Sequence, residues 1–145
     1  MLINTKDYDF VHVNEEDIIQ FPDGIYAFES SKRFVVLDTR AESGVMQLQC
    51  ADAQNPRFVI LDPFMLMDGY SPKVSEETMQ KLKASSLEEL SFFVIAVIPE
   101  NIREATVNMK SPVIINFKER IGMQVILDNR EYPVRFPLFD YERTA

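Results

Sequence analysis

The chain of 145 residues is 46% hydrophobic and 26% charged, a composition typical of a globular protein rather than a disordered or membrane-spanning one. Its length predicts a single domain over residues 1–145 with a short C-terminal tail, Tyr141–Ala145, and the absence of a secretion signal predicts a cytoplasmic protein. The net charge of −8 disfavours binding to nucleic acid or to an anionic membrane surface, and it favours a basic partner.

The residue counts also restrict the chemistry. A single cysteine, Cys50, and a single histidine, His12, exclude an internal disulfide and a tetrahedral Cys/His zinc site within one subunit. Four glycines leave no Gly-rich nucleotide-binding loop, and the acidic residues are not spaced like a calcium loop. We therefore expect no cofactor and no metal site.

Short segments rich in β-branched and aromatic residues recur along the chain and predict strands. In chain order they are Tyr8–Val13, Phe34–Asp38, Val45–Cys50, Arg57–Leu61, Phe92–Ile98, Ala105–Met109, Val113–Phe117 and Met123–Leu127. In Val45–Cys50, apolar residues alternate with Gln47 and Gln49, which predicts a strand with one solvent-facing side. The last two strands form a predicted hairpin, with Lys118–Gly122 as its charged connection.

Turn and helix signals lie between these strands. In Phe21-Pro22-Asp23-Gly24, proline fixes φ and glycine permits a positive φ, which predicts a turn. Ser75 is a candidate helix cap, and Ser86 with Glu89 has the spacing of a capping box. The sequence therefore predicts a mostly β fold: a small antiparallel β-barrel-like domain with one or two short helices.

Few residues suggest catalysis. We interpret His12 as a structural strand residue and Cys50 as a core residue, although these two form the one possible Cys–His dyad. Asp62-Pro63 is expected to end a strand, since proline removes a ladder donor. For the methionine-rich segment Pro63–Met67, core packing is favoured over an adaptable binding surface.

Several islands of sequence follow one another in the order and spacing of a known family. They are Ile19–Gly24, Ala27–Glu29, Phe34–Leu37, Gln47–Cys50, Phe58–Phe64, Val97–Pro99, Thr106–Asn108, Ser111–Asn116, and the single positions Arg120, Gly122, Gln124, Leu127, Tyr132, Arg135, Pro137 and Leu138. Together they resemble the flagellar assembly factor FliW family over residues 2–138. Two departures are Ala27, where the family pattern predicts glycine, and Met109-Lys110-Ser111, where it predicts a more apolar stretch.

The resemblance implies a non-enzymatic protein with two protein partners. Family members bind flagellin in the cytoplasm and antagonise CsrA, a small basic translational regulator, which relieves repression of flagellin mRNA translation. We expect the free protein to be monomeric and to bind neither nucleic acid nor membrane directly. The contact residues expected from the matching islands, chosen as polar or aromatic positions on turns and wet faces, are Asp23, Tyr26, Glu29, Gln47, Asp62, Asn116, Gln124, Tyr132 and Arg135.

Two other classes of function remain open on the sequence. One is a small acidic β-barrel hydrolase or isomerase that uses a carboxylate pair or the His12–Cys50 dyad. The other is an oligonucleotide-binding barrel, which needs a basic groove. Its candidate residues are Lys32, Arg33, Arg57, Lys110, Lys118 and Arg120.

Overall fold

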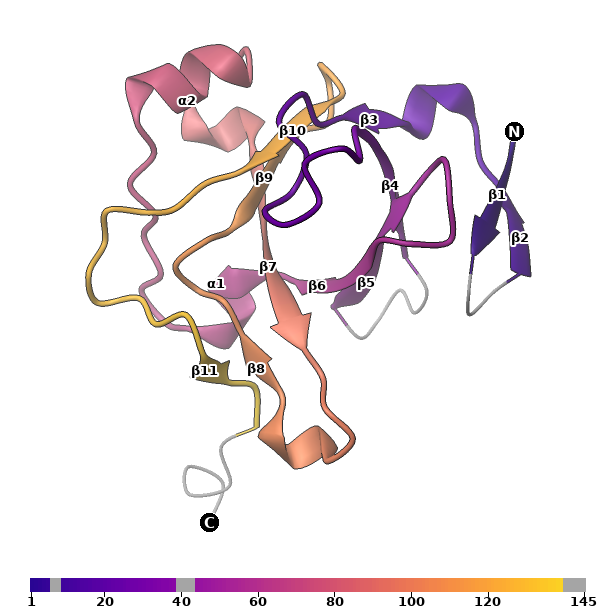
Figure 1. The fold of residues 1–145 in the computed structure, drawn as a ribbon. Helices are drawn as coiled ribbons and strands as arrows, with labels where there is room; N and C mark the ends of the chain where they lie inside the picture. The colour runs from indigo at the N-terminus through magenta and orange to yellow at the C-terminus, as the bar shows by residue number, and fades with distance from the viewer. Residues whose placement is uncertain (6–8, 39–43, 140–145) are drawn as a thin grey trace.

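The computed structural model describes residues 1–5, 9–38 and 44–139, and its centre is a closed barrel of seven strands (Figure 1). Around the barrel the strands are β3 (Ile19–Gln20), β4 (Arg33–Leu37), β5 (Val45–Cys50), β6 (Arg57–Leu61), β7 (Ser91–Val97), β9 (Val113–Asn116) and β10 (Ile121–Gln124). Neighbours are antiparallel except β3 and β10, whose parallel pairing of Gln20 with Ile121 closes the ring. The predicted mostly β, barrel-like fold is confirmed.

Large apolar side chains fill the inside of the barrel. Phe21 and Phe34 are fully buried, with their rings edge to face at a centroid distance of 5.1 Å. Leu48 from β5 and Ile60 from β6 belong to the same buried cluster. Cys50 belongs to the same cluster and is buried, which confirms its predicted place in the core.

Strand β7 is shared between the barrel and a short extension of the sheet. Its first residues, Ser91–Phe93, pair with β9, whereas Ala96 and Val97 pair with β8 (Thr106–Val107). Strand β11 (Phe136–Pro137) pairs with the other edge of β8. The sheet therefore forks along β7, and the fork leaves room for a cleft at this side of the barrel.

A hairpin at the N-terminus covers the outer face of β4. It consists of β1 (Leu2–Thr5) and β2 (Asp9–His12), which lie beside the barrel in Figure 1. Ile3 packs with Val35 of β4 in a small buried cluster. The sequence predicts a strand over Tyr8–Val13, of which Tyr8 lies outside the described residues, and it gives no prediction of β1.

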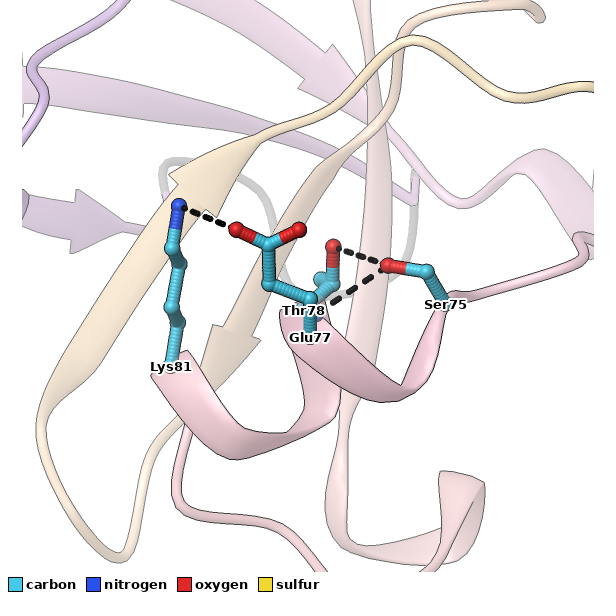
Figure 2. Close-up of polar contacts among 4 residues, drawn as sticks. All are labelled: Ser75, Glu77, Thr78 and Lys81. Atoms are coloured by element: carbon cyan, nitrogen blue, oxygen red, sulfur yellow. Dashed lines mark hydrogen bonds and ion pairs between the residues drawn. The ribbon is translucent and has the colours of Figure 1, made fainter.

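Two short helical elements cover the outer face of β9 and β10, where Leu82 packs on Ile114. In α2 (Glu76–Lys81), the Thr78 N–H donates to Ser75 Oγ at 3.1 Å, and Lys81 lies 3.5 Å from Glu77 (Figure 2). Ser86 and Glu89 form a capping box at η2 (Leu87–Glu89). The predicted Ser75 cap and the Ser86–Glu89 box are both confirmed.

Within the described residues, no helix is long and apolar enough to cross a membrane.

The predicted strand end at Asp62-Pro63 is confirmed, whereas other predictions in this part of the chain and in the last hairpin are only partly right. Strand β6 ends at Leu61, and Asp62 also caps α1 (Pro63–Leu66), where its Oδ1 accepts the Phe64 N–H at 2.9 Å. Leu66 and Met67 pack against a buried cluster, but Met65 is 74% exposed, so core packing holds for only part of Pro63–Met67. Ile121 and Gly122, predicted in the hairpin connection, lie in β10, which ends at Gln124 rather than Leu127. The turn is completed by Arg120, whose φ is 54°.

Candidate functional site

A cleft of about 630 Å³ opens beside the fork in β7. Its floor is formed by Ile25, Phe58 and Ile95, which also pack in the barrel interior. Its rim carries three apolar side chains that are at least half exposed: Tyr26 (50%), Val134 (55%) and Val97 (65%). Small-molecule sites are usually concave and mostly apolar, and exposed apolar patches mark interaction sites, so we take this barrel-mouth cleft as the candidate site.

The loop that carries Tyr26 is shaped by two residues with positive φ. Gly24 has a φ of 66°, and a side chain there would meet the backbone of Phe28 and Glu29 at 2.6 to 2.7 Å. This confirms the turn predicted at Phe21–Gly24, in which the Gly24 N–H donates to the Phe21 carbonyl at 2.9 Å. Ala27 has a φ of 73°, the conformation that favours the glycine expected at this position.

Gln124 ties this loop to the barrel. Its side-chain oxygen accepts the Tyr26 N–H at 3.1 Å, and its amide group donates to the Ser111 carbonyl at 3.2 Å. Phe28 packs edge to face on Phe58, with ring centroids 5.4 Å apart. The exposed Tyr26 ring is thus presented by a backbone held on two sides, which lowers the conformational entropy lost when it contacts a partner.

The polar part of the barrel-mouth cleft carries one charge of each sign, from Glu104 and Arg135, and neutral hydrogen-bonding groups from Thr106, Asn108 and Gln124. Among the described residues, no group of three or more histidine, cysteine, aspartate or glutamate side chains is placed to hold a metal. The arrangement therefore fits recognition of a mainly apolar surface with a few directed polar contacts.

The structure brings three of the nine expected contact residues together: Tyr26, Gln124 and Arg135 line this cleft. Asp23 is exposed in the Phe21–Gly24 turn, on a smaller pocket beside Lys81. Glu29 is exposed, but its carboxylate accepts the Ala27 N–H at 3.1 Å, so it also shapes the loop. Asp62 is half-buried as the α1 cap.

The expectation of exposed positions is wrong for Gln47, Asn116 and Tyr132, which are 6%, 3% and 6% exposed. The Gln47 amide donates to Gln49 Oε1 at 2.8 Å inside a buried pair. The Asn116 amide donates to the Leu82 carbonyl at 2.8 Å and so fixes the end of α2 on the barrel. These three side chains have little surface to offer a partner in this structure, and we leave them out of the proposed contact set.

Tyr132 belongs to a buried polar network outside the barrel. Its hydroxyl oxygen accepts the Ser71 N–H at 2.6 Å, and its ring lies 4.6 Å from that of Tyr70, whose hydroxyl donates to the Met109 carbonyl at 2.8 Å. Burial, with a smaller contribution from Tyr132, raises the pKa of Tyr70 well above its ordinary value. Tyr70 is therefore a neutral donor at physiological pH, and the network joins distant parts of the chain.

The sequence analysis predicted Tyr26 but missed Val97 and Val134, the other two apolar residues of the cleft rim. Val97 is the last residue of β7 and is followed by Ile98 and Pro99. Three apolar residues therefore follow one another at the end of the strand, with no polar residue between them. Val134 and Glu104 lie outside the matching islands and carry no local signal of their own. The Val97–Pro99 run is therefore the local sequence signal for the exposed apolar side chain of Val97.

The residues proposed for catalysis lie apart. Cys50 is buried inside the barrel, whereas His12 is exposed on the N-terminal hairpin and lines a different groove. This placement argues against a His12–Cys50 dyad, which requires hydrogen-bonding distance. The enzyme class accordingly loses its best-defined site.

The basic residues expected for oligonucleotide binding do not all lie on one surface. Arg33 pairs with Asp52 at 2.7 Å, and Arg33 and Arg120 share a small pocket with Glu15 and Glu119. Lys110 lies elsewhere, within 3.4 Å of the Asn129 carbonyl. Carboxylates interleave with the cations, and a phosphate backbone would be repelled by them.

Comparisons with known proteins agree with this fold. A family model described as FliW protein matches residues 2–138. The flagellar assembly factor FliW of Caldanaerobacter subterraneus subsp. tengcongensis is 37% identical, with 100% of this chain and 97% of the relative aligned. That of Clostridium tetani is also 37% identical over 98% of both chains. A crystal structure of a flagellar assembly factor FliW superposes with a TM-score of 0.90 at 29% identity, over 98% of this chain and 99% of the other.

Proposed function

This chain belongs to the FliW family of flagellar assembly factors, and we propose on that premise that it is a partner switch that binds flagellin and CsrA in the cytoplasm. While flagellin accumulates, it occupies the protein. When flagellin is exported, the freed protein binds CsrA and lowers the affinity of CsrA for flagellin mRNA. The switch needs no catalysis and no cofactor.

The observation that carries this proposal is the barrel-mouth cleft. Its exposed Tyr26, Val97 and Val134 side chains form an apolar rim around a preformed opening, and Gln124 fixes the loop that carries Tyr26. Aromatic side chains on a preorganised backbone are frequent energetic centres of protein–protein interfaces. The geometry supports binding to a protein surface.

Charge supports the CsrA part of the proposal. The net charge of −8 steers a basic protein toward this one and raises the association rate at low salt. Salt screens such attraction over a length of about 10 Å at 0.1 M ionic strength.

Calorimetric titration with CsrA and, separately, with flagellin, each at two salt concentrations, tests the proposed function. Binding to both partners, with the affinity for CsrA falling as the salt concentration rises, supports it. Failure to bind either partner contradicts it.

Replacing Tyr26 is expected to weaken at least one of these complexes. Tyr26→Ala removes an exposed aromatic ring but leaves its backbone hydrogen bond to Gln124 in place. Truncation of an aromatic residue at an interface centre costs about 2 kcal/mol, close to thirtyfold in Kd. The matched control is Phe139→Ala, which removes another exposed ring that does not line the cleft. Unchanged affinity of Tyr26→Ala for both partners, measured by calorimetry, means that the cleft is not the binding site.

Reversing the charge of Asp23 is expected to weaken CsrA binding a few-fold at low salt, because each exposed charge contributes about 0.2–1 kcal/mol. Asp23 is a better position for this test than Glu29, because the Glu29 carboxylate also accepts a hydrogen bond from the Ala27 N–H and so shapes the loop. The control Asp68→Lys changes the net charge equally at another exposed turn. Equal effects of the two reversals on affinity and salt dependence would show that only the total charge matters.

A further inference from the structure

A second groove, of about 420 Å³, lies at the opposite end of the β9–β10 hairpin from the barrel-mouth cleft. It is lined by Phe117 and Arg120 of the hairpin turn, whereas the cleft reaches Gln124 at the open end. We call it the β4-edge groove, because its long wall is Val35–Asp38 at the end of β4. The N-terminal hairpin forms the facing wall, beside β4 in Figure 1.

The groove is lined by apolar side chains from both faces of β4, which together we call its floor. Val36 packs partly into the barrel interior, and Leu37 packs with the hairpin cluster. Phe117 is 45% exposed on the rim and contacts Phe93 edge to face at 6.2 Å. An apolar side chain of a partner would find the same kind of surroundings here as in a small hydrophobic pocket.

Carboxylates outnumber cations among the described residues that line this groove. Glu16, Asp17 and Asp38 are exposed there, and Arg120 is the one lysine or arginine of that described set. The first two lie in η1 (Glu15–Asp17), the short turn that precedes β3. The rim therefore favours a cationic partner.

The backbone of β4 has an open edge in this groove. The Ala51 N–H donates to the Arg33 carbonyl, and by antiparallel alternation Val35 and Leu37 also direct their backbone groups to β5. The N–H and C=O of Val36 then point the other way, toward the side of β3. Strand β3 begins only at Ile19, opposite Phe34, and the same register places Asp17 of η1, rather than a strand residue, opposite Val36.

We propose that the β4-edge groove binds an extended segment of a partner protein that adds a strand next to Val36, with apolar side chains on the groove floor and lysine or arginine side chains facing Glu16, Asp17 and Asp38. Addition of a strand supplies main-chain hydrogen bonds, and the pockets for alternate side chains supply specificity. The proposal does not rest on the binding of flagellin or CsrA.

A fluorescein-labelled peptide of alternating lysine and leucine, seven residues long, is the probe. Fluorescence anisotropy with the full-length protein is expected to show saturable binding, with at least tenfold weaker binding of two control peptides. In one control serine replaces leucine, and in the other glutamate replaces lysine. Equal binding of the lysine–serine peptide would show attraction by net charge alone and would overturn the proposal, as would failure of the lysine–leucine peptide to bind.

Two pairs of matched variants locate the site. The double variant Asp17→Asn, Asp38→Asn is expected to bind the probe five- to tenfold more weakly. Its control, Glu76→Gln with Glu88→Gln, makes an equal change of charge at exposed positions elsewhere and is expected to leave the Kd of the probe within twofold. Phe117→Ser is likewise expected to weaken binding, and Ile126→Ser, at a 61% exposed position outside the groove, is its control. Equal losses in a variant and its control contradict this location.

Amide hydrogen exchange reads out the added strand directly. The Val36 amide faces the open edge and is expected to exchange at least tenfold more slowly with saturating probe, while the Val35 amide, already paired with β5, changes little. All of these variants change exposed residues. Their thermal unfolding midpoints are measured to check that each variant keeps the fold. Probe binding without protection of Val36 would overturn the strand-addition geometry.

Discussion

Gly122→Ala is expected to destabilise the protein by about 3 kcal/mol, the upper end of the usual cost of overpacking a core. A β-carbon at this position would lie 2.6 Å from Cζ of Phe21 and 2.9 Å from its Cε1. The Phe21 ring is fully buried and packs edge to face on Phe34, so it has nowhere to move. Urea denaturation followed by circular dichroism measures the free energy of unfolding.

A double-mutant cycle separates the ring clash from other effects of Gly122→Ala. Phe21→Leu removes the aromatic edge and, combined with Gly122→Ala, is expected to cost at least about 1 kcal/mol less than the sum of the two single substitutions. Gly69→Ala is a reference for a glycine substitution without a clash. Gly69 has a φ of 74°, but no heavy atom lies within 4 Å of the added β-carbon. Additive costs in the cycle would show that the Phe21 ring is not what requires glycine.

Gln49→Leu is expected to cost about 3 kcal/mol, because it removes a buried donor that serves several carbonyl groups. Gln49 is fully buried, and its Nε2 lies 3.1 Å from each of the carbonyl oxygens of Cys50, Ala53 and Gln54. An amide group has only two hydrogens, so at least one is shared. Its oxygen also accepts the Gln47 amide at 2.8 Å.

The matched control for this substitution is Gln54→Leu, which removes an exposed glutamine whose amide donates to Asn4 Oδ1 at 3.1 Å. It is expected to cost less than about 0.5 kcal/mol, as most surface substitutions do. Hydrogen exchange in the turn after β5 gives a second measurement, since Gln49→Leu should speed exchange there. Similar unfolding free energies for the two variants would mean that the buried amide is dispensable.

The two glutamines of β5 show why a strand can be predicted correctly while the solvent exposure of its side chains is predicted wrongly. Alternation in Val45–Cys50 predicted the strand, and the structure has it with the same ends. The polar side was expected to face water, but Gln49 lies opposite Val35 on the face that the N-terminal hairpin helps to cover. Since β1 was not predicted, nothing in the local pattern showed that this face is buried.

The candidate site was predictable in part for the same reason. Tyr26, Gln124 and Arg135 share the cleft because the barrel brings the ends of distant segments together, and their polar or aromatic character was visible in the sequence. Asn116 has the same character, but its amide is satisfied by a carbonyl 34 residues away at the end of α2. Residue type indicates a possible contact, whereas long-range packing decides whether the side chain is exposed.

The parallel pairing of β3 with β10 has a consequence for synthesis on the ribosome. Gln20 and Ile121 are about a hundred residues apart, and contacts of such long range form late because closing the loop costs entropy. Until β10 has left the exit tunnel, the nascent chain holds an incomplete sheet with unpaired edges at β3 and β9, the two strands that β10 joins. A stalled chain that lacks β10 would therefore be a substrate for chaperones rather than a smaller folded protein.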